Sequence, residues 1–268
     1  IILLTFLQLF HVSPFNEAVI ISVDGFGDFA SSAWGFGKGK EIKIDKRVFF
    51  PHSLGIFYQA LTQWLGFPNY GDEYKVMGLA PYGKPEHMDI MRELVLVKND
   101  GSFELGLKYF RFHKEKIDYQ WENSEPKIGL LFSELLEETI GPMRQKDQEL
   151  TQFHKNIARS VQEMYEEAFF NLLNQTHSNY GVDYLCLAGG CAMNSVANGK
   201  IYQKTPFKKI YVQSAAGDAG GAIGAAFTVW HRLGGNREFY MDHAFWGPKF
   251  NEEYFQKLLK KNYKVWKK

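Results

Sequence analysis

The spacing of apolar positions changes several times along the chain, and each spacing predicts a different kind of element. Residues 18–25 form an apolar, β-branched run that ends in Asp-Gly, which is typical of a strand that enters a turn. Two alternating runs follow, SSAWGFG and EIKIDKRVFF, and the three runs together predict an antiparallel meander. Helical spacing from about Ser53 to Leu65 then predicts a helix that stops at Gly66.

The middle of the chain has a less regular pattern. Residues 71–85 are too polar and too rich in Gly and Pro to predict a regular element. Residues 85–97 predict a short helix with Pro85 near its start. Residues 101–112 alternate like a strand, whereas residues 111–130 have no clear period, which favours a surface excursion.

A long amphipathic helix is predicted over about residues 147–177. After it the pattern predicts a strand, a helix, a strand and a helix, in the segments VDYLCLAGG, NSVANGKIYQ, KKIYVQ and GDAGGAIGAAFTVWHRLGG. This order is typical of an α/β unit with parallel strands. The pattern therefore predicts the α/β fold class.

The opening segment IILLTFLQLF is apolar, but it is shorter than the roughly twenty residues that span a bilayer. It also lacks the basic region and the cleavage site of a signal peptide. We expect a buried helix or strand here, and no membrane partner. Cys186 and Cys191 lie in a predicted strand and turn, where free thiols behave as small apolar groups, so we expect a reducing, cytoplasmic location.

The charges are balanced, with 31 Lys and Arg residues against 30 Asp and Glu and a net charge of +1. We therefore expect no nucleic-acid partner, since binding to phosphate backbones favours a basic excess. The hydrophobic fraction of 45% indicates a folded globular protein. The absence of a Walker sequence, a serine nucleophile elbow and a zinc-spaced Cys/His set disfavours P-loop kinases and serine hydrolases.

Two glycine-rich turns follow the last two predicted strands. In the first turn the backbone N–H groups of Gly189, Gly190 and Cys191 are candidates to bind an anion at a helix N-terminus. Asn194 adds a neutral donor for a phosphate or a ribose. The alternative is a tight strand-to-helix turn in which Asn194 caps the helix.

The second turn, AAGDAGGAIGAA, has small residues at nearly every position, among them Gly217, Gly220 and Gly221. Such a turn can lie against a flat nucleotide ligand, or it can simply pack closely against a strand. Asp218 within it could cap the following helix or bind a divalent cation through its oxygens.

A third candidate turn, VDGFGDF, carries Asp24 and Asp28 and leaves the backbone bare at Gly25 and Gly27. Asp-Gly turns are common in hairpins, so this motif is weak by itself. Nucleotide-binding folds of the actin, Hsp70 and sugar-kinase type place such turns against phosphates from each half of the molecule. The three turns together favour a cleft between two lobes.

The segment GDEYKVMGLAPYG places charged and aromatic residues between glycines, which is typical of a loop that contacts a substrate. Glu73 and Lys75 are its candidate site residues, beside Asp72; the alternative is a solvated surface loop. His52, next to the start of a predicted helix, could carry a proton in catalysis, although a single histidine is more often structural.

Five segments together resemble the NodU/CmcH/TobZ family of O-carbamoyltransferases, and the resemblance covers about Ser13 to Gly247. In the family's order, they are SPFNEAVIISVDGFGDFASS, HSLGIFYQALTQWLGF, YGDEYKVMGLAPYGKP, LAGGCAMNSVANGKI and VQSAAGDAGGAIGAAF. The resemblance implies an actin-like (ASKHA, ribonuclease H-like) two-lobed domain, similar to the protein that attaches threonylcarbamoyl to tRNA.

The same resemblance implies a division of the chain. We expect residues 1–145 to be the remainder of a truncated first lobe, residues 146–235 the second lobe, and residues 236–268 the start of a linker towards a YrdC-like domain outside this chain. That domain would make carbamoyladenylate from ATP and carbamoyl phosphate. The actin-like domain would then transfer the carbamoyl group to the hydroxyl of a small-molecule acceptor.

By resemblance, Asp24 and Asp218 match the family's metal-binding aspartates, one from each lobe, for an iron- or manganese-like divalent ion. The turns at Gly189–Gly190 and Gly217–Gly221, with Asn194, match its nucleotide-binding loops. These positions imply an acyl transfer in which AMP is the leaving group.

One departure from the family concerns its HHxxH stretch. Counting back from Ala18 places that stretch on Ile1, Ile2 and Thr5, so the two metal-binding histidines are missing. We therefore expect the isolated chain to be inactive or nearly so. Two alternatives follow: a tRNA threonylcarbamoyl transferase-like protein, and a non-catalytic nucleotide-binding module.

Overall fold

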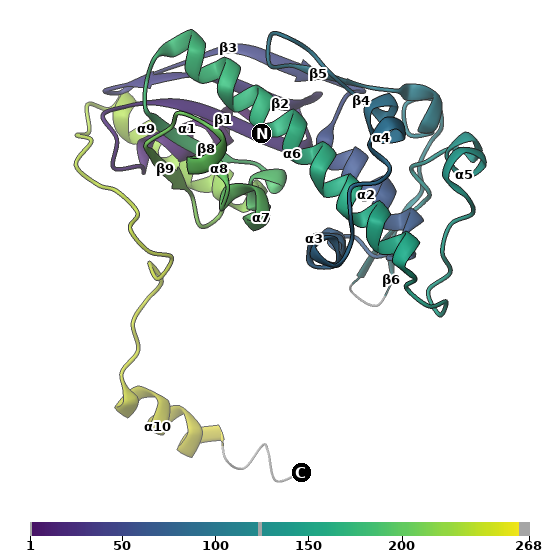
Figure 1. Ribbon diagram of the computed structural model, residues 1–268. Helices are drawn as coiled ribbons and strands as arrows, with labels where there is room; N and C mark the ends of the chain where they lie inside the picture. Colours follow the sequence, from purple (N-terminus) through teal and green to yellow (C-terminus); the bar gives the residue numbers. More distant parts are fainter. Residues whose placement is uncertain (1, 123–124, 263–268) are drawn as a thin grey trace.

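The computed structural model describes residues 2–122 and 125–262, which surround one five-stranded mixed sheet in the order β3-β2-β1-β8-β9 (Figure 1). The predicted meander is confirmed as three antiparallel strands, β1 (Glu17–Gly27), β2 (Ala30–Lys38) and β3 (Glu41–Phe49). The two predicted parallel strands are also confirmed: β8 (Tyr184–Ala188) pairs with β1, and β9 (Lys209–Val212) pairs with β8.

The alternation along β1 separates two apolar cores, one on each face of the sheet. Val19, Ile21 and Val23 face the larger core with residues of α2 (Leu54–Trp64) and α6 (Gln152–Tyr180). Ala18 and Ile20 face the smaller core. Figure 1 shows α6 lying across the sheet and continuing alongside α2. Helices thus cover both faces, as the parallel strands require.

The opening apolar segment forms helix α1 (Ile2–His11), which packs in the smaller core through Phe6, Leu9 and Phe10. The prediction of a buried helix or strand is therefore confirmed as a helix. No helix in the described residues is both long and apolar enough to cross a bilayer. Ile1, one of the positions where the HHxxH stretch was expected, lies outside the described residues.

The two predicted long helices are confirmed, and each begins at a capping residue. The Ser53 side chain accepts a hydrogen bond of 3.1 Å from the backbone N–H of Ile56 at the start of α2. Thr151 and His154 form reciprocal hydrogen bonds at the start of α6. Gly181 ends α6 with a φ of 64°, a left-handed conformation that glycine adopts without steric cost.

The prediction that residues 71–85 lack a regular element was wrong. They contain α3 (Glu73–Leu79) and the 3-10 turn η1 (Ala80–Tyr82). Both pack against α6, with Val76 and Ala80 buried. Tertiary packing therefore stabilises a helix whose local composition is unfavourable.

The rest of the middle region is also more regular than predicted. Helix α4 (Met88–Leu94) begins three residues after Pro85, and the predicted strand over 101–112 is only β5, which pairs with β4. Residues 111–130, predicted to be irregular, contain the hairpin β6-β7. The elements are β4 (Val95–Val97), β5 (Phe103–Leu105), η2 (Leu107–Tyr109), β6 (Tyr119–Glu122), β7 (Glu125–Ile128) and α5 (Glu134–Ile140).

After β8 the predicted single helix is interrupted at Gly199. The segment contains η3 (Gly190–Met193), α7 (Ser195–Asn198) and α8 (Ile201–Lys204). After β9 the predicted helix is confirmed as η4 (Asp218–Gly220) followed by α9 (Gly221–Arg232), which packs against α1.

The expected division at residue 145 does not separate two sheets. Strands β1 to β3 of the expected first lobe and β8 and β9 of the expected second lobe form one hydrogen-bonded sheet. The physical reason is the parallel pairing of β1 with β8, which joins strands far apart in the chain. In residues 236–262, Arg237 and Met241 still bond to the body, whereas α10 (Glu252–Asn262) stands apart from it (Figure 1); residues 263–268 lie outside the described part.

Candidate functional site

A pocket of about 400 Å³ lies where β1 and β8 end, a size typical of small-molecule sites. Parallel strands bring their carboxyl ends to the same edge of a sheet, and open α/β sheets bind ligands there. The pocket is lined by carboxylates, bare backbone and aromatic side chains, including Asp24, Gly25, Tyr58, Tyr70, Glu73, Tyr74, Gly190, Asn194 and Asp218. Four segments that the sequence singled out separately therefore meet in one place.

Asp24 reaches the pocket because the β1-β2 register shifts between Val23 and Gly27. Such a bulge interrupts the alternation of a strand and redirects a side chain. The prediction of a turn at Asp24-Gly25 was therefore wrong: the strand continues to Gly27, a buried residue, and the hairpin turns at Asp28 and Phe29, which both have positive φ.

The Asp24 carboxylate accepts hydrogen bonds from two backbone N–H groups, those of Gly25 at 2.8 Å and of Gly190. Burial raises the pKa of Asp24, the two hydrogen bonds oppose this shift, and the negative charge of Asp218 adds to it. The electrostatic influence of Asp218 and the shared pocket place the two aspartates on the same crevice, as expected.

The first glycine turn is built differently from the predicted anion cradle. The N–H of Gly189 donates to the Ala216 carbonyl at 2.8 Å, and the N–H of Gly190 donates to Asp24. Gly189 has a φ of 92°, and a Cβ added there would lie 2.1 Å from the Val23 carbonyl oxygen. The expectation that the Gly189 N–H points at an anion was therefore wrong, because this group already has a protein acceptor, whereas Gly190 and Cys191 line the pocket.

Asn194 caps a helix, which is one of the two functions that the sequence left open, and it also faces the pocket. Its Oδ1 accepts a hydrogen bond of 3.0 Å from Ala197, which caps α7, and the residue also lines the pocket. Its side chain bonds further to Gln162 of α6. Asn194 is therefore held from two sides where it faces the pocket.

Asp218 lines the pocket with an exposed side chain and makes no capping hydrogen bond. The residue that precedes η4 is Gly217, and the one that precedes α9 is Gly220, so the interpretation of Asp218 as a helix cap was wrong. Gly217, the buried Gly220 and the half-buried Gly221 form the turn that carries Asp218, without lining the pocket themselves. The Asp218 carboxylate is thus available to a ligand.

The α3 segment contributes Glu73 to the pocket, and burial raises the pKa of this carboxyl group. Lys75 does not line it; its ammonium pairs with Asp72 at 2.6 Å. His52 is also outside the pocket lining, and its Nδ1 accepts a hydrogen bond of 3.0 Å from the backbone of Leu105. The structure therefore brings Glu73, and neither Lys75 nor His52, to the site.

Sequence reasoning missed the aromatic wall of the pocket, made of Tyr58, Tyr70 and Tyr74. It also missed Gly55, where a Cβ would lie 2.9 Å from the Gly25 backbone, so only glycine lets α2 approach β1 here. One feature of the sequence could have indicated a polar site: Gln162 and Glu166 place polar side chains on the buried face of the long helix α6.

The residues present do not fit the expected iron- or manganese-like site. Asp24 and Asp218 provide oxygen ligands alone, and the described residues contain no group of three His, Cys, Asp or Glu side chains that could hold a metal. Iron sites commonly include imidazole nitrogens, and a manganese-like ion that binds carboxylates needs more ligands than two side chains supply.

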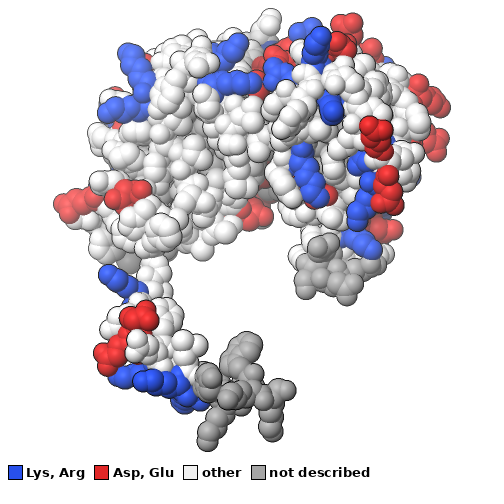
Figure 2. Space-filling model, turned by 60° about the horizontal axis from the view of Figure 1, so that its bottom comes forward, with Lys and Arg blue, Asp and Glu red and all other residues white. Residues whose placement is uncertain are grey.

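Charged side chains of both signs are interspersed on the face shown in Figure 2. No single-sign field covers the described part of that face, as the composition suggests.

Comparison with known proteins identifies the family. Residues 7–227 match the family described as carbamoyltransferase N-terminus. The chain is 38% identical to an uncharacterised protein of Synechocystis, 35% identical to nodulation protein NolNO of Sinorhizobium fredii and 35% identical to nodulation protein NolO of Bradyrhizobium diazoefficiens. These matches cover 94%, 89% and 91% of this chain but only 40%, 32% and 40% of those relatives. The chain therefore belongs to the carbamoyltransferase family and corresponds to its N-terminal domain.

Proposed function

We propose that this chain is the actin-like domain of an O-carbamoyltransferase, which moves a carbamoyl group from carbamoyladenylate to a hydroxyl of a small molecule. The observation that carries the proposal is the shared pocket of Asp24 and Asp218, which are far apart in the sequence. The mixed sheet, with its meander and two parallel strands, supports the actin-like assignment. A YrdC-like domain would supply the adenylate from ATP and carbamoyl phosphate.

The proposed reaction is an acyl substitution at the carbamoyl carbon. The acceptor oxygen forms a bond to that carbon, and the bond from the carbon to the phosphate oxygen breaks, which releases AMP. The acceptor proton needs a base. We assign this role to Asp218, because its carboxylate is exposed within the pocket and makes no capping bond.

The other pocket residues bind and position the adenylate in this proposal. The aromatic side chains of Tyr70 and Tyr74 offer surfaces on which a flat base can stack. Asn194 supplies a neutral donor. Asp24 positions the turn at Gly190 through the hydrogen bond between them.

A substitution of Asp218 tests the proposal in the protein that joins this chain to its YrdC-like domain. Asp218→Asn should lower carbamoyl transfer from labelled carbamoyl phosphate to hydroxylated acceptors by about 100-fold or more, the usual effect of losing a base. Synthesis of the adenylate, followed as pyrophosphate release, should be unchanged. Asp242→Asn is the matched control, since this exposed carboxylate lies outside the pocket lining.

Equal loss of carbamoyl transfer and of adenylate synthesis in Asp218→Asn would contradict the proposed separation of these two reactions between the two domains. A second candidate function, a non-catalytic nucleotide-binding module, is favoured by the shortage of metal ligands among the described residues. This second function predicts that the wild-type protein binds a non-reactive analogue of the adenylate and transfers no carbamoyl group to any acceptor, whereas the first proposal requires transfer.

A further inference from the structure

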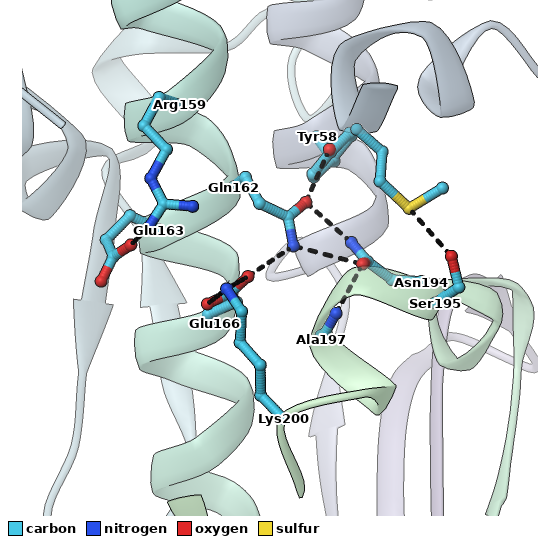
Figure 3. A network of polar contacts seen from close by, with 10 residues as sticks. Tyr58, Arg159, Gln162, Glu163, Glu166, Asn194, Ser195, Ala197 and Lys200 are labelled. Atoms are coloured by element: carbon cyan, nitrogen blue, oxygen red, sulfur yellow. Dashed lines mark hydrogen bonds and ion pairs between the residues drawn. The ribbon is translucent and has the colours of Figure 1, made fainter. Parts of the chain in front are cut away.

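A buried polar network connects α6 to the pocket (Figure 3). At its centre the amide of Gln162, a fully buried side chain, makes four hydrogen bonds. Its Oε1 accepts from the Tyr58 hydroxyl at 2.9 Å and from Asn194 Nδ2 at 2.9 Å. Its Nε2 donates to Glu166 at 2.9 Å and to Asn194 Oδ1 at 3.2 Å. All the hydrogen-bonding capacity of this amide is used.

Glu166 determines which way this amide faces. Its side chain is buried, and both carboxylate oxygens accept hydrogen bonds of 2.6 Å from the Lys200 ammonium. Because both oxygens of this side chain act as acceptors, Glu166 must face the N–H₂ side of Gln162. A flipped amide would place its oxygen against Glu166 and Asn194 Oδ1, and its N–H₂ against the N–H₂ of Asn194.

The orientation of Gln162 in turn determines what Tyr58 and Asn194 present to the pocket, which both residues line. The Tyr58 hydroxyl donates its single hydrogen to Gln162, so its oxygen can only accept a hydrogen bond from a ligand. Asn194 uses its oxygen for Gln162 and for the α7 cap, and one of its two N–H bonds for Gln162. It therefore offers a ligand an N–H donor.

We infer that Glu166 and Gln162 are positioning residues that make the pocket specific for a carbamoyl group. A carbamoyl group carries an N–H₂ donor next to a carbonyl acceptor, which complements the Tyr58 oxygen and the Asn194 N–H. The two groups are neighbours, because both bond to the same atom, Gln162 Oε1. An acetyl group has the same shape but would leave the buried Tyr58 oxygen without a donor, and sites with such unpaired groups reject analogues strongly.

This inference rests on the proposed function, and a matched pair of ligands tests it. The probes are two sulfamoyl analogues of the adenylate that differ only in carrying a terminal carbamoyl or acetyl group. Calorimetry on the full-length wild-type protein should show that the carbamoyl analogue binds at least about tenfold more tightly. In Tyr58→Phe and Gln162→Met the two affinities should come within about twofold of each other, with binding of the acetyl analogue retained.

A control and a folding check accompany these variants. Tyr109→Phe removes another buried tyrosine hydroxyl, one that bonds to Glu93 away from the pocket lining, and should keep the wild-type preference. Thermal unfolding identifies any loss of structure in Gln162→Met, and Tyr58→Phe, which keeps the ring, provides the independent test. An unchanged preference in Tyr58→Phe overturns the inference alone. Failure of the wild-type protein to bind either analogue overturns the proposed function, and the inference with it.

Discussion

Asp24 lies in the pocket because the bulge in β1 changes the direction of its side chain. The sequence indicated Asp24 and Asp218 as site residues, and the structure places both at one pocket. It also indicated Gly189, but for a different function: the residue makes room for the Val23 carbonyl of the neighbouring strand and does not present its N–H to a ligand. At the residue scale, composition reveals that a position is unusual, and packing decides the reason.

Gly189→Ala should destabilise the protein. The residue has a φ of 92°, and its new Cβ would lie 2.1 Å from the Val23 backbone, which cannot move without disturbing the sheet. Backbone strain alone costs about 1–3 kcal/mol, and the steric clash adds to it. Urea unfolding measures the loss. Gly78→Ala is the control: a Cβ at Gly78 meets nothing within 4 Å inside helix α3, so stability should stay equal or rise by less than about 1 kcal/mol.

At the scale of elements, periodicity predicted the elements that dominate the core. Strands β1 to β3 are long apolar or alternating runs. Helices α2 and α6 combine several turns of helical spacing with capping residues. Helix α3 was missed because it is only seven residues long, is flanked by Gly and Pro, and is stabilised by packing on α6. Contacts between elements also shift the pKa of side chains buried between them, as the packing of α1 against α9 does for His11.

The α1-α9 contact should make stability depend on pH. His11 is buried, its ring centroid lies 4.4 Å from that of His231, and Arg237 is nearby. Burial, His231 and Arg237, in that order, lower the pKa of His11 from 6.5 to about 4. Between these values the unfolded chain binds more protons than the folded one, so stability rises with pH and is lost on acidification.

The loss attributable to His11 should be about 2 kcal/mol between pH 7 and pH 5, at about 1.4 kcal/mol for each pH unit below 6.5. It is measured as the difference between wild-type and His11→Gln in urea unfolding at both values. His243→Gln, at a half-exposed position, should retain the wild-type pH dependence. A His11→Gln variant with the same acid loss as wild type would contradict the assignment.

At the scale of the whole molecule, parallel pairing of β1 with β8 joins in one sheet strands from the two segments that the family resemblance assigned to different lobes. The first and last helices differ in how much of their surface is buried. Helix α1 is packed in the smaller core, whereas α10 stands apart with residues 252–261 exposed (Figure 1). The sequence already separates the two helices, since α1 is almost wholly apolar and α10 carries several Glu and Lys residues, and the fold shows the consequence.

Two leucine substitutions test this difference. Leu9→Ala in α1 removes a fully buried side chain and should lower the free energy of unfolding by about 3 kcal/mol. Leu259→Ala in α10 alters a side chain that is 68% exposed, so the change should stay within about 0.5 kcal/mol. Urea unfolding of both variants measures the two values, and equal losses would show that α10 packs against the body in solution.

The sequence by itself determined the α/β class, the order of the main strands and helices, the family resemblance and the two aspartates of the site, because these depend on local periodicity and on motif residues. Only the tertiary structure decided that the strands share one sheet, that Gly189 serves packing, that His52 and Lys75 lie away from the pocket, and that Gln162 orients Tyr58 and Asn194. These properties depend on contacts between residues far apart in the chain. A local sequence pattern does not show which distant residue will form a hydrogen bond with a buried polar group.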